Sequence, residues 1–85
     1  MILRCYSVKD TAVDAFMPPF FERHDGAASR AFANAVKDPN HAFSKSPGDF
    51  LLYFIGLFDD SLGSISSPVS IQLIIRGAEI AKSGL

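Results

Sequence analysis

The sequence is poor in residues that carry catalysis or hold metals. Cys5 is the only cysteine among 85 residues, so one copy of the chain cannot form an internal disulfide. Its place early in an apolar segment is typical of a small core residue. His24 and His41 stand in no spacing typical of acid–base catalysis or metal binding, and there is no glycine-rich phosphate loop. Asp59 and Asp60 are adjacent, but such pairs usually form turns. We predict no catalytic site, no metal and no cofactor.

An excess of charge of one sign is also missing. Eight Lys and Arg residues face nine Asp and Glu residues, which gives a formal net charge of −1. This balance excludes a strongly basic nucleic-acid-binding protein. If the chain binds DNA, it must do so through a local patch.

No apolar run is long enough to cross a membrane. The longest candidate, residues 50–58, falls well short of the roughly 18–20 residues that a spanning helix needs. The first ten residues show no basic region before an apolar stretch, as a signal peptide would. We expect no membrane association and a cytoplasmic, reducing location.

Apolar and aromatic residues, in contrast, are abundant. Hydrophobic residues make up 48% of the chain, and eight of its residues are Phe. A chain of this length predicts one domain, residues 1–85, which buries only about 60–65% of its extended surface. The apolar surplus therefore favours a homodimer or an interface with another partner.

The pattern along the chain predicts a strand, a loop, a helix and then two or three further strands. Residues 2–9 read as a strand, and Pro18 and Pro19 predict an ordered loop after it. Asp25 is a plausible N-cap for a helix that ends at Asp38, and Phe32 is the single large residue of its apolar stripe. Residues 69–76 read as another strand, and the tail as a short helical turn or a frayed end. The expected fold class is α+β: a small three- to four-stranded, mainly antiparallel sheet with one helix packed on a face.

The segment of residues 50–58 is apolar on both faces of the expected strand. Phe50, Leu52, Phe54 and Phe58 point one way, and Leu51, Tyr53, Ile55 and Leu57 point the other. Gly56 marks a bulge or a close backbone approach. We expect the helix to cover one face and a second chain to cover the other.

Aromatic and basic residues supply the materials of a single-strand nucleic-acid surface. Around the prolines, Phe16, Phe20 and Phe21 either plug the core or form an exposed platform. The candidate nucleic-acid-binding residues are Arg4, Tyr6, Lys9, Phe20, Phe21, Arg23, Arg30, Lys45 and Tyr53.

Three segments, in this order and spacing, resemble one protein family. They are "YSVKDTAVDAFMPPFF", "AASRAFANAVKDP" and "SPGDFLLYFIGLFDDSLGSI", which together cover roughly residues 6–65. The chain is similar to the small nonstructural protein of gokushovirus-type microviruses, which are bacteriophages with single-stranded DNA. The resemblance implies a role in viral DNA synthesis and packaging, often described as DNA binding, in the host cytoplasm.

The chain departs from that family where polar residues are usual and Phe54 and Leu57 stand instead. These two residues are therefore the candidate interface of a homodimer. The leading hypothesis is a non-enzymatic phage accessory protein that binds single-stranded DNA, as a homodimer whose joined surfaces collect positive charge. The alternative is a protein–protein adaptor that recruits a phage or host replication protein and makes no contact with DNA.

Overall fold

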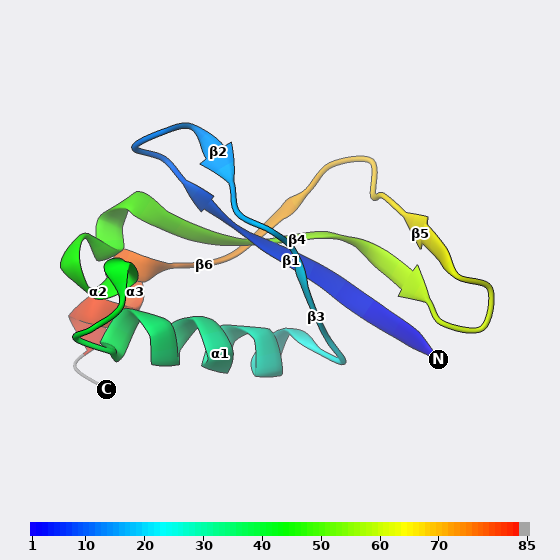
Figure 1. The fold of residues 1–85 in the computed structure, drawn as a ribbon, viewed down its shortest axis with the longest axis horizontal. Helices are drawn as coiled ribbons and strands as arrows, with labels where there is room; N and C mark the ends of the chain where they lie inside the picture. Colours follow the sequence, from blue (N-terminus) through cyan, green and yellow to red (C-terminus); the bar gives the residue numbers. More distant parts are fainter. Residues whose placement is uncertain (84–85) are drawn as a thin grey trace.

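The computed structural model describes residues 1–83 as a curved sheet with helices on one side (Figure 1). The strands are β1 (Ile2–Asp10), β2 (Ala15–Phe16), β3 (Phe20–Glu22), β4 (Phe50–Asp59), β5 (Ser64–Ser66) and β6 (Gln72–Arg76). The helices are α1 (Asp25–Lys37), α2 (Ala42–Lys45), the 3₁₀ turn η1 (Pro47–Asp49) and α3 (Gly77–Ser83). The predicted α+β class with a mainly antiparallel sheet is confirmed, whereas the strand count and the single helix are not.

The sheet is four strands wide although it contains six strands. β1 and β4 pair antiparallel along their whole length in the centre. β2 and β3 share the outer edge of β1, and β5 and β6 share the outer edge of β4. Pro18 and Pro19 lie between β2 and β3, and Pro68 lies between β5 and β6. Proline has no N–H to donate to a ladder, which explains why each outer position is split into two short strands.

The helix α1 begins one residue earlier than the sequence indicated. His24, not Asp25, is the N-cap, because its Nδ1 accepts a hydrogen bond of 3.1 Å from the Ala27 N–H. Asp25 is the first residue of the helix, and its carboxylate is free to bind elsewhere. The helix buries Ala28, Phe32 and Val36 at spacings of four residues, which confirms Phe32 as its large anchor.

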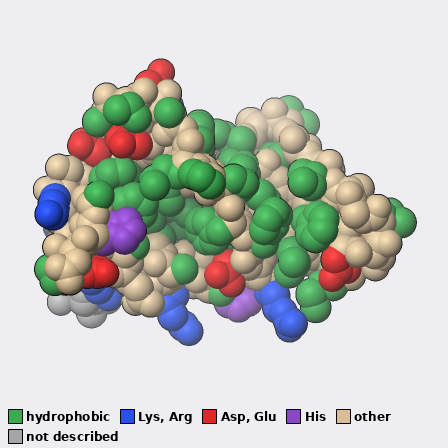
Figure 2. Space-filling view, viewed as in Figure 1, with side chains coloured by type: hydrophobic (Ala, Val, Ile, Leu, Met, Phe, Trp, Pro, Cys, Tyr) green, Lys and Arg blue, Asp and Glu red, His purple; other side chains and the backbone are tan. Residues whose placement is uncertain are grey.

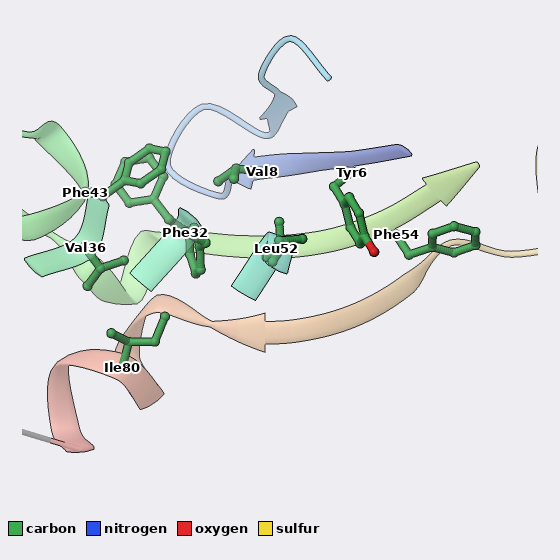
Figure 3. Close-up of a cluster of buried hydrophobic side chains, with 10 residues drawn as sticks. Tyr6, Val8, Phe32, Val36, Phe43, Leu52, Phe54 and Ile80 are labelled. Carbon is green, nitrogen blue, oxygen red and sulfur yellow. The ribbon is translucent and has the colours of Figure 1, made fainter. Parts of the chain in front are cut away.

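One face of β4 forms the centre of the core. Phe50, Leu52 and Phe54 are buried, and Leu52 is fully so. They meet α1 through Phe32, while side chains of β1, α2 and α3 complete the cluster (Figure 3). Ile80 joins it from α3, so the predicted short helical turn near the C-terminus is a helix docked on the core. Residues 84–85 of that predicted tail lie outside the described residues.

Two glycines allow close backbone approaches. A Cβ on Gly56 would lie 2.7 Å from the Ser66 carbonyl oxygen, and the β1–β4 register shifts beside it. Both predicted meanings of Gly56, bulge and close approach, are therefore confirmed. Gly77 was not singled out in the sequence, yet a Cβ there would lie 2.2 Å from the Pro47 carbonyl oxygen. It lets α3 start directly against η1.

Candidate functional surfaces

A polar cluster ties the first strand to the start of α1. The Tyr6 hydroxyl donates to Asp25 Oδ1 at 2.6 Å, and Arg4 Nε donates to the same oxygen at 2.9 Å. The Arg4 guanidinium lies 4.0 Å from the centre of the Phe54 ring, within the range of a cation–π contact. The aromatic ring of Tyr6 stacks on Phe20 at 5.7 Å. Several kinds of contact therefore hold these side chains in one arrangement.

The titration of this cluster follows from its contacts. Burial raises the pKa of Tyr6 to about 12, and its hydrogen bond to Asp25 adds to the increase because the hydroxyl must keep its proton to donate. The pKa of Asp25 is lowered, first by the hydrogen bond from Tyr6 and then by Arg4. An ionised carboxylate and a protonated phenol at neutral pH make this cluster a structural brace.

Two residues of the predicted surfaces must therefore be withdrawn. Tyr6 is fully buried, so its ring cannot stack on a nucleic-acid base. Phe54, which we predicted in a dimer interface, is 7% exposed and lies in the core beneath Arg4. Leu57 is partly buried and also packs against the core. The sequence placed Phe58 on the same face as Phe54 and Leu57 on the other, but the register shift beside Gly56 reverses this order, so Leu57 faces the core and Phe58 the opposite side.

Exposed basic residues lie on the helices and just before α1, where Arg23 precedes the N-cap His24. Arg23, Arg30 and Lys37 follow one another at intervals of seven residues and are exposed. Arg30 and Lys37 lie two turns apart, about 10 Å along α1, on the side opposite to its buried residues. We call these three residues the α1 basic stripe. Arg23 and Arg30 were predicted site residues; Lys37 was missed, although the spacing of seven was readable.

Positive and negative charges are segregated in the fold. Within the described residues 1–83, Arg4, Lys9 and Arg76 form ion pairs with carboxylates, whereas the α1 basic stripe, Lys45 and Lys82 do not. The one acidic residue within α1 is Asp25, which Arg4 and Tyr6 already bind. Asp10 and Asp14 flank the β1–β2 turn, and Asp59 and Asp60 flank the β4–β5 turn. A net charge of −1 thus coexists with a locally basic helix side.

The face of the sheet opposite to the helices is apolar. Six of the apolar residues that register places on this side form what we call the open sheet face: Phe16, Phe21, Tyr53, Phe58, Ile65 and Leu73. Phe16 contacts Tyr53 and Phe21 contacts Phe58, each with ring centres 5.6 Å apart. Within residues 1–83, all α-helices lie on the other side of the sheet (Figure 1). The predicted helix cover of one face is confirmed; cover of the other by a second chain stays a prediction.

The small residues of β1 lie beneath the open sheet face. Cys5 is 5% exposed and pairs in register with Phe21 and Gly56. Burial raises the pKa of its thiol, which agrees with the predicted core role and not with a nucleophile. The Ser7 hydroxyl donates to the Met17 carbonyl at 2.6 Å. Cys5 and Ser7 therefore make their contacts within the chain.

The aromatic residues around Pro18 and Pro19 have separate destinations. Phe20 packs against the core and lines an apolar groove of about 250 Å³ beside α1, as one predicted alternative required. Phe16 and Phe21 are 45% and 42% exposed on the open sheet face, as the other alternative required. Figure 2 shows a broad band of hydrophobic side chains over the strands, with Lys and Arg side chains at its lower and left margins.

The predicted nucleic-acid residues therefore do not form one site. Arg4 and Tyr6 lie in the brace, and Lys9 is paired with Asp14 at 3.1 Å. Phe21 and Tyr53 lie on the sheet face remote from α1, while Arg23 and Arg30 lie on the stripe. Lys45 is exposed at the end of α2. Phe21 and Tyr53 thus lie on the opposite side of the sheet from the unpaired cations, whereas the half-buried Phe20 lies on the same side as α1.

The predicted turn carboxylates have ordinary structural partners. Asp59 Oδ1 accepts hydrogen bonds from the Ser61 and Leu62 N–H groups, and Asp60 binds the N-terminal amine at 2.7 Å. Over residues 1–83, no group of three or more His, Cys, Asp and Glu side chains could hold a metal ion. A helix with the length and apolar character of a membrane span is likewise missing from that part of the chain.

Comparison with known families indicates that the chain is a phage protein. A model of the Phage ORF5 protein family matches residues 3–80, nearly the whole chain. The chain belongs to the Phage ORF5 protein family. No curated protein and no solved structure matches it. The family match covers most of β1, all of β2 to β6 and α1, the elements that carry the brace, the α1 basic stripe and the open sheet face.

Proposed function

We propose that this Phage ORF5 protein is a non-enzymatic microvirus accessory protein that binds single-stranded DNA during viral DNA synthesis and packaging in the host cytoplasm. The observation that carries the proposal is the α1 basic stripe. Arg23, Arg30 and Lys37 are exposed, and within residues 1–83 no carboxylate pairs with them. Cations in this arrangement suit a phosphate backbone, whose charge dominates nucleic-acid affinity.

The geometry favours backbone contact without base readout. Stacking requires an aromatic face beside the cations, as in most single-strand binders. Here Tyr6 is buried, and Phe21 and Tyr53 lie on the other side of the sheet from α1. Phe20 lies on the side of α1, but it is half-buried and its ring is stacked on Tyr6. We therefore propose binding that is independent of sequence, moderate in affinity and steeply weakened by salt.

Fluorescence anisotropy of a labelled single-stranded oligonucleotide, at low and moderate salt, tests the proposal. The Arg30→Gln/Lys37→Gln variant removes two cations of the stripe and should weaken binding about tenfold or more at low salt. Lys45→Gln/Lys82→Gln is the matched control, because it removes two exposed cations from α2 and α3, outside the α1 basic stripe and outside the sheet. The control should bind like the wild type. Absence of binding by the wild type at low salt contradicts the proposal.

A second function, an adaptor for a phage or host replication protein, draws on the open sheet face. An uncovered apolar face of this kind is typical of protein interfaces. A pulldown from infected cells after nuclease treatment tests it: recovery of a replication protein by the wild type, but not by a Phe21→Gln/Leu73→Gln variant, favours the adaptor. Loss of every partner on nuclease treatment favours DNA binding.

A further inference from the structure

The open sheet face is too apolar to be an ordinary solvent face of an antiparallel sheet. Such sheets usually alternate apolar residues toward the core with polar residues toward water. Here the residues on the solvent side include two aromatic pairs, Phe16 with Tyr53 and Phe21 with Phe58. Ile65 of β5 and Leu73 of β6 extend the face onto the two short strands that pair with β4.

The most exposed apolar side chains of this face supply about half of the area that a standard interface takes from each partner. Phe16, Phe21, Ile65 and Leu73 are 45%, 42%, 68% and 36% exposed. Their exposed fractions add up to nearly two whole side chains. This is roughly 400 Å² of exposed area if each side chain has about 200 Å². The half-buried Tyr53 and Phe58 add to it, as does the backbone around them. A standard interface takes about 800 Å² from each partner, and its apolar centre is a part of that area.

The charges on this face suit a second copy of the same chain. In a two-fold symmetric contact the same patch of each copy meets the other, so unpaired charges of one sign on that patch would face one another. The two cations that register places on this face, Lys9 and Arg76, are already paired with Asp14 and Glu79. The face is therefore apolar and locally neutral, which permits packing against itself.

We propose that two copies of this chain pack their open sheet faces together as a two-fold dimer. Aligned sheets pack about 10 Å apart with interdigitating side chains, and the two aromatic pairs of each copy supply the centre of the contact. This placement differs from the Phe54 and Leu57 interface expected from the sequence. It also leaves α1 of each copy on the outside, since α1 lies on the other face of the sheet (Figure 1).

The dimer has a consequence for DNA, which rests on the proposed function. The two α1 basic stripes point in opposite directions, so they do not join into one positively charged groove as the sequence-based hypothesis required. Each stripe instead engages its own segment of backbone. The dimer thus bridges two segments of single-stranded DNA and brings them together, which is the kind of contact that compacts a strand.

Analytical ultracentrifugation across a concentration series, without DNA, tests the dimer. The wild type should form a dimer, and Phe21→Gln/Leu73→Gln should raise its dissociation constant at least tenfold, because symmetry counts each substitution twice. Val69→Gln is the control, since this exposed residue lies in the connection between β5 and β6. Ile65→Gln is a second disrupting variant at a 68% exposed position, where a folding defect is least expected. A monomeric wild type, or dimers unaffected by both variants, overturns the proposal.

Energy transfer between two oligonucleotides, one with a donor dye and one with an acceptor, tests the bridging. The wild type and Val69→Gln should raise the transfer, whereas Phe21→Gln/Leu73→Gln should bind DNA without raising it. Arg30→Gln/Lys37→Gln should stay dimeric and lose both binding and transfer. A dimer that binds DNA without transfer overturns the bridging. A dimeric wild type that does not bind DNA overturns the proposed function and the bridging with it, but leaves the interface standing.

Discussion

The two faces of the central strand pair have similar composition but different surroundings. On the helix side, Val8, Leu52 and Phe54 are buried against α1, and one polar cluster, Arg4–Tyr6–Asp25, closes the rim. On the other side, Phe21, Leu73 and their neighbours are apolar yet partly exposed. The hydrophobic pattern of a strand indicates how many of its faces become covered, but not what covers each of them. The first face is completed within the chain, and we propose that the second is completed between chains.

Replacing one leucine on each face should give the largest difference in stability between the two faces. Leu52→Ala on the fully buried face should lower the free energy of unfolding by about 2–5 kcal/mol, through lost burial and the cavity left behind. Leu73→Ala on the open sheet face should cost less than about 1 kcal/mol in dilute protein, where the monomer dominates. Urea unfolding with equal m-values checks both. Equal losses would mean that the open face is packed within the monomer.

Alkaline pH should weaken the helix-side face specifically. The pKa of Tyr6 is raised from 10 to about 12 in the folded chain, so its contribution is complete below pH 10 and is lost as pH rises through 12. The loss should reach about 2–3 kcal/mol, since each unit of pKa shift is worth about 1.4 kcal/mol. Urea unfolding between pH 9 and 12 (roughly the span of the titration) measures it. Tyr6→Phe is the control and should lack this part of the decline.

Adding one methyl group at Gly56 should show how closely the outer strand approaches. A Cβ there would meet the Ser66 carbonyl oxygen, so Gly56→Ala should cost about 1–3 kcal/mol through the displacement of β5. Gly48→Ala is the matched control, because a Cβ at Gly48 meets nothing within 4 Å. Thermal unfolding of the two variants compares them. A neutral Gly56→Ala would mean that β5 moves without cost.

The smallest of these effects should come from the carboxylate of the brace. Asp25→Asn should cost about 1–2 kcal/mol at neutral pH, because a charge-assisted hydrogen bond from Tyr6 and one from Arg4 are weakened. The lowered pKa of Asp25 means that its contribution is present above the ordinary Asp pKa and is lost as pH falls through the folded value. The variant should therefore lose less stability than the wild type between pH 5 and 2 (about the range in which Asp titrates). Identical acid unfolding curves of the variant and the wild type would mean that the Asp25 carboxylate does not stabilise the fold.

Long regular segments were predictable from the sequence, and short or tertiary features were not. The aromatic-rich apolar run of residues 50–58 predicted β4, and apolar spacing around Phe32 predicted α1. β2 and β3 contain two and three residues, too few for a period of two to be recognised. The role of Asp25 was also hidden, because its partners Arg4 and Tyr6 lie about twenty residues away and meet it only in the folded chain.

The candidate surface was predictable in its materials but not in its arrangement. The sequence indicated Arg23 and Arg30 of the α1 basic stripe, and the seven-residue interval to Lys37 could have indicated the third. It could not separate Tyr6 from Phe21, since both are aromatic residues near basic ones, although the first is in the core and the second on the open face. Membership of the Phage ORF5 protein family adds the phage context. Only the register of the strands shows which residues face the helices and which lie on the open sheet face.

The salt dependence of DNA binding tests the central claim most directly. A plot of log Kd against log salt concentration for single-stranded DNA should lose about 1 to 1.5 units of slope in Arg30→Gln/Lys37→Gln, at about 0.7 for each phosphate contact removed. The slope of Lys45→Gln/Lys82→Gln, with the same change in net charge but outside the stripe, should equal that of the wild type. An unchanged slope in the stripe variant, or an equal loss in both variants, would contradict the claim that α1 carries the DNA contact.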